Sequence, residues 1–212
     1  MKYKALLKRV FGQEIDIINA FIVMVNQYRV PKFAYRGKGS QVGLPIICTS
    51  PKNVILEDFT RINPNATIIS YTGKFVLKKY SEVAFGCTIV TGNHTPTVGV
   101  PQYKLGHSHL NDIEEDVIIE EDVWIGANVT ILKGVHIGRG CVVGANSLVN
   151  KSIPPYSVVV GSPAHIIGAK FTKEQILKHE EILYCEGDRL TEERLDELFS
   201  TYYYNLRTIG VE

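Results

Sequence analysis

The strongest pattern in this sequence is a six-residue repeat that runs through its second half. One aliphatic series comprises Ile113, Ile119, Ile125, Ile131, Ile137, Val143 and Val149, and a second series four positions later comprises Val117, Val123, Val129, Val135, Cys141, Ser147 and Ile153. An α-helix would drift out of phase with a strict six-residue period, and a single strand would alternate without turns. The repeat therefore predicts short straight segments stacked coil on coil, an all-β solenoid in which one aliphatic residue per segment points into a narrow interior.

The same phase returns upstream, in two runs separated by a three-residue insertion. These runs place aliphatic residues at Leu56, Ile62 and Ile68, and again at Leu77, Val83 and Ile89. We expect the solenoid to cover residues 33–168, with residues 33–55 forming an irregular first coil. The stretch HTPTVGVPQYKLGHSHLND has turn formers and no aliphatic repeat. It predicts an excursion loop over residues 95–112, and long loops in compact folds are commonly functional.

Both ends of the chain differ from the repeat. Residues 1–32 are expected to form a partly helical leader, whose apolar run from Ile15 to Val25 is too short to span a bilayer. We interpret this run as a packing segment, with peripheral membrane contact as the alternative. Residues 169–212 are predicted to be helical, because TKEQ at residues 172–175 matches a capping box and a second helix is expected near Thr191. These helices would cap the open end of the solenoid.

The composition of the chain limits the kinds of ligand and partner that it is expected to bind. Lys and Arg number 23 against 22 Asp and Glu, a net charge of +1, so no global field attracts nucleic acid. The four cysteines are widely spaced and form no CxxC pair, which disfavours a zinc or redox site. No signal-peptide pattern is recognisable. We therefore expect a cytoplasmic protein without an integral membrane segment, in which any anionic ligand is held locally.

The stretch DVWIGANVTILKGVHIGRGCVVGANSLVNKSIPPYSVVVGSPAHII, together with TGNH, resembles the hexapeptide-repeat acyltransferases over roughly residues 54–168. This resemblance implies a left-handed parallel β-helix, acetyl-CoA as co-substrate, and a homotrimer whose active sites lie between neighbouring prisms. The sequence looks most similar to sugar and polysaccharide O-acetyltransferases, with serine and xenobiotic acetyltransferases as alternatives. Galactoside-type enzymes carry an acidic substrate contact where this chain has Ser70 and Tyr71, so recognition of the same sugar is not implied.

Acetyl transfer to a hydroxyl or amine needs a base for the acceptor proton and donors for the charge that develops on the thioester oxygen. His94 in TGNH opens the loop and is our predicted general base, because the pKa of histidine lies near neutral pH. His109 or Asp112 is predicted to orient the base or the acceptor, with packing within the loop as the alternative, and His107 is a weaker candidate. These three histidines could instead hold a metal, as in carbonic anhydrases built on the same solenoid, but we expect none.

The resemblance also implies ligand contacts. The positions that line the cofactor groove in relatives correspond to Trp124, Ala127, Ala145, Asn150 and Lys151. Small alanines leave room for the thin pantetheine arm, and a lysine suits its phosphates. Asn63 matches a position that contacts the acceptor in sugar acetyltransferases, and we assign Tyr71 to the same acceptor site. A turn and packing role is the alternative for Asn63, the alanines and Trp124.

Overall fold

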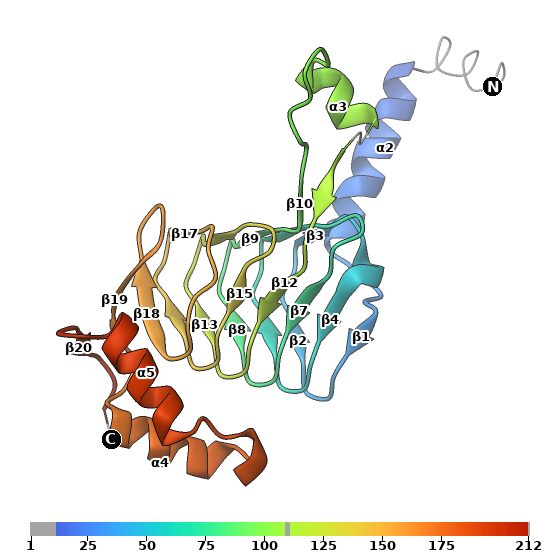
Figure 1. Ribbon diagram of the computed structural model, residues 1–212. Coiled ribbons are helices and arrows are strands. Elements are labelled where there is room, and N and C mark those ends of the chain that lie inside the picture. Colours follow the sequence, from blue (N-terminus) through green and yellow to red (C-terminus); the bar gives the residue numbers. More distant parts are fainter. Residues whose placement is uncertain (1–11, 109–110, 212) are drawn as a thin grey trace.

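The computed structural model describes residues 12–108 and 111–211, and its core is a three-sided prism of parallel strands (Figure 1). Face A consists of β1 (Tyr35–Arg36), β4 (Val54–Leu56), β7 (Phe75–Leu77), β12 (Val117–Ile119) and β15 (His136–Ile137). Face B consists of the parallel strands β2 (Gln41–Val42), β5 (Arg61–Ile62), β8 (Glu82–Val83), β13 (Trp124–Ile125), β16 (Val142–Val143) and β18 (Ser157–Val160). It is extended by β19 (His165–Ala169), which runs antiparallel to β18, and by β20 (Arg207–Thr208), which pairs with β19. Face C consists of β3 (Ile46–Cys48), β6 (Ala66–Ile69), β9 (Thr88–Val90), β14 (Thr130–Ile131) and β17 (Leu148–Val149). Each coil passes through the faces in the order A, B, C, so we name the prism's edges AB, BC and CA.

The interior consists of columns of the predicted repeat residues. In-register parallel pairing places Leu56, Leu77 and Ile119 above one another on face A. The equivalent columns on faces B and C are Ile62, Val83, Ile125, Val143 and Ile68, Ile89, Ile131, Val149, and all of these side chains are at most 1% exposed. Ile113 is the exception at 52% exposed. It lies in β11 (Ile113–Glu114), outside the prism, so its predicted place in the interior series is wrong.

Residues 33–55 form a regular first coil, which corrects the irregular coil expected from the sequence. β1, β2 and β3 each pair in parallel with the strand of the next coil, β4, β5 and β6. The aliphatic series is weak here because the inward position of the turn between β1 and β2 is Ser40, which is buried. The backbone ladder therefore continues the coil where the side-chain pattern fades.

Close approach between coils explains the small residues at the BC edge. A Cβ atom on Gly126 would lie 2.6 Å from the backbone nitrogen of Ala145 in the next coil. Asn128 and Asn146 take positive φ angles of 57° and 59° in the same turns, which asparagine tolerates better than most residues. The WIGAN and VGAN motifs are thus built for tight turns.

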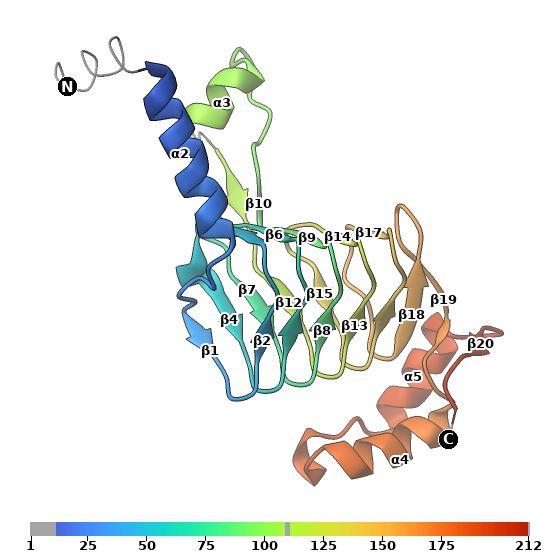
Figure 2. The ribbon, with the colours of Figure 1, turned by 180° about the vertical axis from the view of Figure 1, so that it is seen from behind.

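Three extensions leave the prism (Figures 1 and 2). Helix α2 (Gly12–Gln27) projects from the first coil, and the arm, residues 92–114, projects between the third and fourth coils. The arm contains β10 (Gly92–Asn93), α3 (Gln102–Ser108) and β11, so it is more ordered than the loop that the sequence predicts. The C-terminal extension consists of α4 (Lys173–Leu183) and α5 (Glu192–Tyr202), with the short helix η2 (Glu186–Asp188) between them. A further short helix, η1 (Pro51–Asn53), precedes β4.

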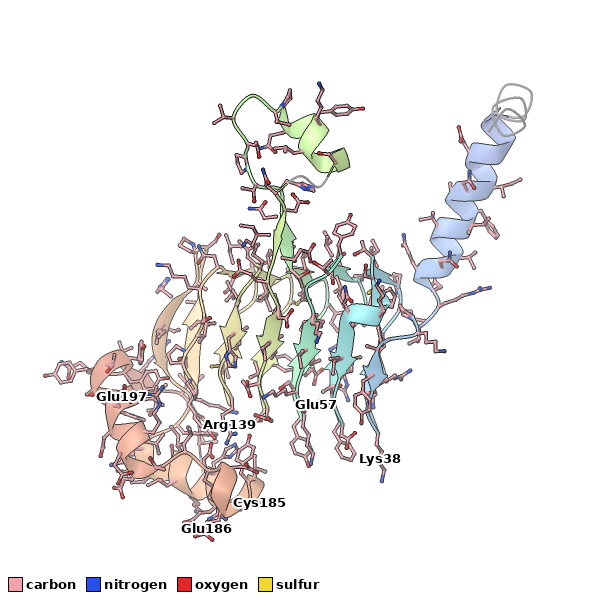
Figure 3. All side chains as sticks on the ribbon, turned by 45° about the vertical axis from the view of Figure 1, so that its right-hand side comes forward. Lys38, Glu57, Arg139, Cys185, Glu186 and Glu197 are labelled. Carbon is pink, nitrogen blue, oxygen red and sulfur yellow. The ribbon has the colours of Figure 1, made fainter. Side chains whose placement is uncertain are left out.

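The C-terminal helices are joined to the AB edge through a buried carboxylate. The predicted capping box is confirmed, since Thr172 and Gln175 form it, and the predicted second helix begins directly after Thr191, whose side chain caps α5. Glu180 of α4 accepts hydrogen bonds from Tyr156 (2.6 Å) and Arg139 (3.1 Å). Figure 3 shows Arg139 at this edge beside the C-terminal extension, which carries Cys185, Glu186 and Glu197, with Glu57 and Lys38 further along the edge.

The interior columns predict a sharp difference between adjacent residues of β12. Ile119→Ala opens a cavity in the fully buried column and should lower the free energy of unfolding by about 2–5 kcal/mol. Ile118→Ala is the matched control, because the neighbouring side chain points outward, and it should cost less than about 1 kcal/mol. Chemical denaturation of both variants measures the difference, and equal losses would contradict the assigned orientation.

Candidate functional site

The base of the arm brings His94 and Asp112 together. β10 and β11 pair antiparallel, with Gly92 opposite Glu114 and Asn93 opposite Ile113. The next pair in this register is His94 and Asp112, 18 residues apart in the sequence. The Nδ1 atom of His94 lies 2.9 Å from Oδ2 and 3.2 Å from Oδ1 of the Asp112 carboxylate. The register of β10 against β11 therefore brings the His94 imidazole next to the Asp112 carboxylate.

This pair has the arrangement of a general base and its orienting group. A carboxylate at Nδ1 fixes the tautomer in which Nε2 carries the lone pair that can accept a proton, and it stabilises the imidazolium that forms. The His94 side chain is 44% exposed whereas that of Asp112 is 16% exposed. The Nε2 atom faces helix α3, where a Cβ atom on Gly106 would lie 3.9 Å away. The imidazole therefore stands in an open site with α3 beside its reactive nitrogen.

Glu114, which the sequence did not single out, fastens the arm to the neighbouring turn. One carboxylate oxygen accepts hydrogen bonds from the backbone N–H groups of Tyr71 (3.3 Å), Thr72 (3.2 Å) and Gly73 (2.8 Å). The same oxygen accepts the Thr91 hydroxyl at 2.8 Å. Burial raises the pKa of Glu114, but these four hydrogen bonds outweigh it and hold the pKa below its ordinary value of 4.5. Only the fold reveals this role, because the donors lie 23 to 43 residues away.

The CA edge carries the first half of the predicted site. Tyr71 follows β6, in a turn that Glu114 holds, and its side chain is exposed. Asn150 and Lys151 follow β17 at the same edge and are also exposed. His94 follows β9 through β10, so the CA edge carries the predicted base, one predicted acceptor contact and two predicted cofactor contacts.

The BC edge carries the second half. Trp124, Ala127, Ala145 and Asn63 line one hollow of about 600 Å³. Other side chains of this hollow include Arg61, Glu82, Phe85 and Val142. Glu82 Oε1 accepts from the Asn63 amide at 2.8 Å and lies 3.3 Å from an Arg61 guanidinium nitrogen. A hollow with small, mostly apolar walls and a polar end suits a thin, flexible ligand.

One chain does not bring these halves together, because face C separates the two edges. The outward residues of the face C strands are uncharged: Ile47, Thr67, Ile69, Thr88, Val90, Thr130 and Leu148. Face B, in contrast, exposes Arg61 and Glu82, which form an ion pair. An uncharged strip of aliphatic and threonine side chains between two half-sites is a surface suited to contact with another subunit.

Three other predicted features have distinct outcomes. His109 lies outside the described residues, and so does the side chain of His107. Among the side chains that the structure describes, no group of three histidine, cysteine or acidic residues is arranged to hold a metal.

Comparison with known families gives one match. Residues 116–151 match the bacterial transferase hexapeptide family (six repeats), which covers β12 to β17. No curated protein matches the chain in sequence. None of the helices described between residues 12 and 211 is both long and apolar enough to cross a bilayer.

Solved structures extend the match over more of the chain. A hexapeptide-repeat acetyltransferase from Vibrio cholerae is 28% identical with a TM-score of 0.58, covering 79% of this chain and 89% of that one. A maltose O-acetyltransferase from Clostridium difficile 630 is 26% identical with a TM-score of 0.57, covering 79% and 84%. A galactoside acetyltransferase in complex with coenzyme A shares the fold at 24% identity and a TM-score of 0.55, covering 75% and 73%. The predicted resemblance and the left-handed parallel β-helix are confirmed.

The hydrogen bonds of Glu114 predict a pH-dependent effect on stability. Glu114→Gln replaces a charged acceptor of four hydrogen bonds and should lower the free energy of unfolding by about 1–2 kcal/mol at neutral pH. Because the folded-state pKa is below 4.5, the stabilisation is complete above pH 4.5 and is lost as the pH falls through the folded-state value. The difference between wild type and variant should therefore shrink in acid. Denaturation at several pH values measures it, and a constant difference would contradict the assignment.

Proposed function

We propose that this chain, whose repeats match the hexapeptide transferases and whose fold is that of their acetyltransferases, transfers an acetyl group from acetyl-CoA to a hydroxyl of a sugar or polysaccharide precursor. The observation that carries this proposal is the His94 and Asp112 pair on a prism of this family. A maltose O-acetyltransferase among the similar structures supports a sugar hydroxyl as the acceptor, and an amine is the alternative.

The donor is assigned to the BC edge. A structure of the similar Vibrio cholerae acetyltransferase contains acetyl-CoA, which supports the same co-substrate here. Ala127 and Ala145 leave the hollow open for the pantetheine arm, and Trp124 forms one wall. Asn150 and Lys151 at the CA edge are exposed where they are free to meet polar groups and phosphates of the same ligand.

A cyclic homotrimer unites the two edges. If face C of every subunit points toward a threefold axis, the BC edge of one subunit meets the CA edge of the next. Each subunit then uses each edge once, so the ring closes and forms three equivalent sites. The uncharged outward residues of face C support this arrangement, because charged side chains are depleted in the core of such interfaces.

The chemistry then follows from the positions of the side chains. His94 Nε2 takes the proton of the acceptor hydroxyl as its oxygen bonds to the thioester carbonyl carbon. Asp112 holds Nδ1 and stabilises the imidazolium. The carbon–sulfur bond breaks, and His94 returns the proton to the departing thiolate. Asn63 and Tyr71 are assigned to the acceptor, so the products are the acetylated acceptor and CoA.

We also place the reaction in the cytoplasm. All four cysteines are unpaired, and Cys87 and Cys141 are buried. Burial raises the pKa of the Cys141 thiol to about 12, so it is unreactive. Unpaired, inert thiols are typical of proteins in a reducing compartment.

His94→Ala should separate binding from chemistry. The change removes proton abstraction, so kcat should fall by roughly 10²- to 10⁴-fold, while acetyl-CoA affinity stays near wild type. His109→Ala should cost less, and His107→Ala little. His136→Ala is the matched control, because His136 is an exposed histidine on face A that pairs with Glu120 away from both edges. Steady-state kinetics with a panel of sugar acceptors and calorimetric binding of acetyl-CoA measure the two effects. Activity within a few-fold of wild type in His94→Ala would refute its role.

Mixed assemblies test the shared site directly. His94→Ala disables the CA edge, and Ala127→Trp fills the hollow at the BC edge, so each variant alone should be inactive. When the two are co-expressed, about a quarter of the sites in randomly mixed rings combine two intact edges, so activity should return to about a quarter of wild type. A site within one chain predicts no recovery, because every chain would carry one lesion.

A further inference from the structure

A column of turn residues at the AB edge shares the left-handed backbone conformation. Each lies two positions before the first ladder residue of a face B strand, and the column consists of Gly39, Phe59, Tyr80, Asp122, Gly140 and Tyr156, with φ angles between 55° and 71°. Glycine adopts this conformation readily and aspartate tolerates it, whereas a bulky side chain is an outlier there. The turn itself therefore does not explain an aromatic ring at this position.

Tyr156 has its explanation inside the chain, but Phe59 and Tyr80 do not. Tyr156 is fully buried, and its hydroxyl donates a hydrogen bond to Glu180 of α4 at 2.6 Å. Phe59 and Tyr80 remain 48% and 45% exposed. Their rings stack on each other, with centroids 5.7 Å apart and planes inclined by 14°. An unfavourable backbone conformation that carries an exposed ring points to a function of that ring.

Polar side chains of face B connect this aromatic pair with the BC edge. A hollow of about 210 Å³ beside Phe59 and Tyr80 is lined by Gln41, Arg61 and Glu82. The Nε atom of Arg61 donates to Gln41 Oε1 at 3.1 Å, and a second guanidinium nitrogen donates to Glu82 Oε1 at 3.3 Å. Arg61 and Glu82 also line the hollow of about 600 Å³ at the BC edge. The two hollows therefore adjoin and form a strip across face B.

The strip ends at a predicted acceptor contact. At the BC edge Asn63 donates to Glu82 Oε1 at 2.8 Å. The side chains of Phe85 (54% exposed) and Trp124 (46%) line the same hollow. Exposed rings thus flank hydrogen-bonding groups at both ends of the strip. In the proposed ring, the BC edge meets the edge of the next subunit that carries His94, so a ligand lying along the strip brings one end to the base.

The chemistry of the strip fits a chain of sugar units. A sugar ring has faces of C–H groups and a rim of hydroxyls, and each hydroxyl both donates and accepts hydrogen bonds. Hydroxyls can pair with the Gln41 amide, the Arg61 guanidinium and the Glu82 carboxylate, while aromatic side chains supply apolar contact. Arg61 and Glu82 form an ion pair. This pair has no net charge to attract a polyanion such as nucleic acid.

We propose that face B binds an extended saccharide acceptor, with Phe59 and Tyr80 as a distal subsite for a sugar unit that is not itself acetylated. This inference rests on the proposed function and narrows its acceptor to an oligosaccharide or polysaccharide. Arg61 and Glu82 lie between the aromatic pair and Asn63. A ligand that contacts both ends therefore spans the width of face B and is longer than one sugar unit.

Removing the rings of the distal subsite tests the proposal. Tyr80→Gly and, as a second variant, Phe59→Gly place in each turn the residue that its backbone conformation favours, so the fold is retained. Tyr35→Ala is the matched control, because Tyr35 is an exposed aromatic residue on face A. The probes are glucose, galactose and N-acetylglucosamine, each as the monosaccharide and as its tetrasaccharide. Calorimetry measures their binding, and steady-state kinetics with acetyl-CoA measures transfer to them.

The effect should depend on the length of the acceptor. In at least one series, wild type should bind the tetrasaccharide about tenfold or more tightly than the monosaccharide. Tyr80→Gly and Phe59→Gly should each weaken tetrasaccharide binding by about threefold to tenfold, the range expected for loss of an aromatic contact. Binding of the monosaccharide should change less, and kcat/KM should follow the same order. Tyr35→Ala should keep the wild-type preference.

Two results would overturn the inference: wild-type binding that does not strengthen with length in any series, or a length preference that both glycine variants retain. Binding and transfer also separate this inference from the proposed function. Tetrasaccharide binding that depends on Tyr80, without acetyl transfer to any probe, supports the saccharide site and counts against the proposed function. Acetyl transfer without a preference for length supports the proposed function and refutes the distal subsite.

Discussion

The parallel ladder between successive coils is the interaction on which every other feature of this protein depends. Each strand is only two to five residues long, so no strand is stable alone, and the in-register stacking of coils supplies both backbone partners and a dry interior. That register also assigns each position of a coil to a face or an edge. Tyr71 and Asn150 are far apart in the sequence, but each follows a strand of face C in its own coil. They therefore lie at the same edge of the prism.

The sequence predicts those parts of the fold that side-chain periodicity encodes. Ile119, Ile125 and Ile131 belong to a repeat that only a stacked coil satisfies, and they are fully buried. Prediction fails where backbone pairing acts without that signal. The first coil is regular despite Ser40 at an inward position, and Ile113 continues the six-residue series although it pairs with β10 outside the prism. In each case hydrogen bonding between backbones, which sequence periodicity does not report, decides the structure.

In the candidate site, too, some residues are predicted from the sequence and others are recognised only from the fold. Family resemblance identifies His94 and Trp124, and the structure places them at different edges. Glu114 carries no motif, and its function depends on N–H groups that face it only after folding. Carboxylates that bind several backbone N–H groups commonly lock turns, and here the locked turn carries Tyr71. Sequence therefore names residue types suited to the chemistry, while the fold decides which of them lie at the same edge of the prism.

The arm closes at its base through a ladder of two residue pairs, and the Glu114 carboxylate fastens that base to the turn that carries Gly73. The described residues between these contacts, including α3, lie outside the coil stack and are not part of its interior columns. The length and composition of that segment are consequently free to diverge, or to be exchanged by grafting, without disturbing the prism or the register that opposes His94 to Asp112. A fold built on this plan has a simple route to new surroundings for His94, because the segment around that side chain is separate from the part that maintains the fold.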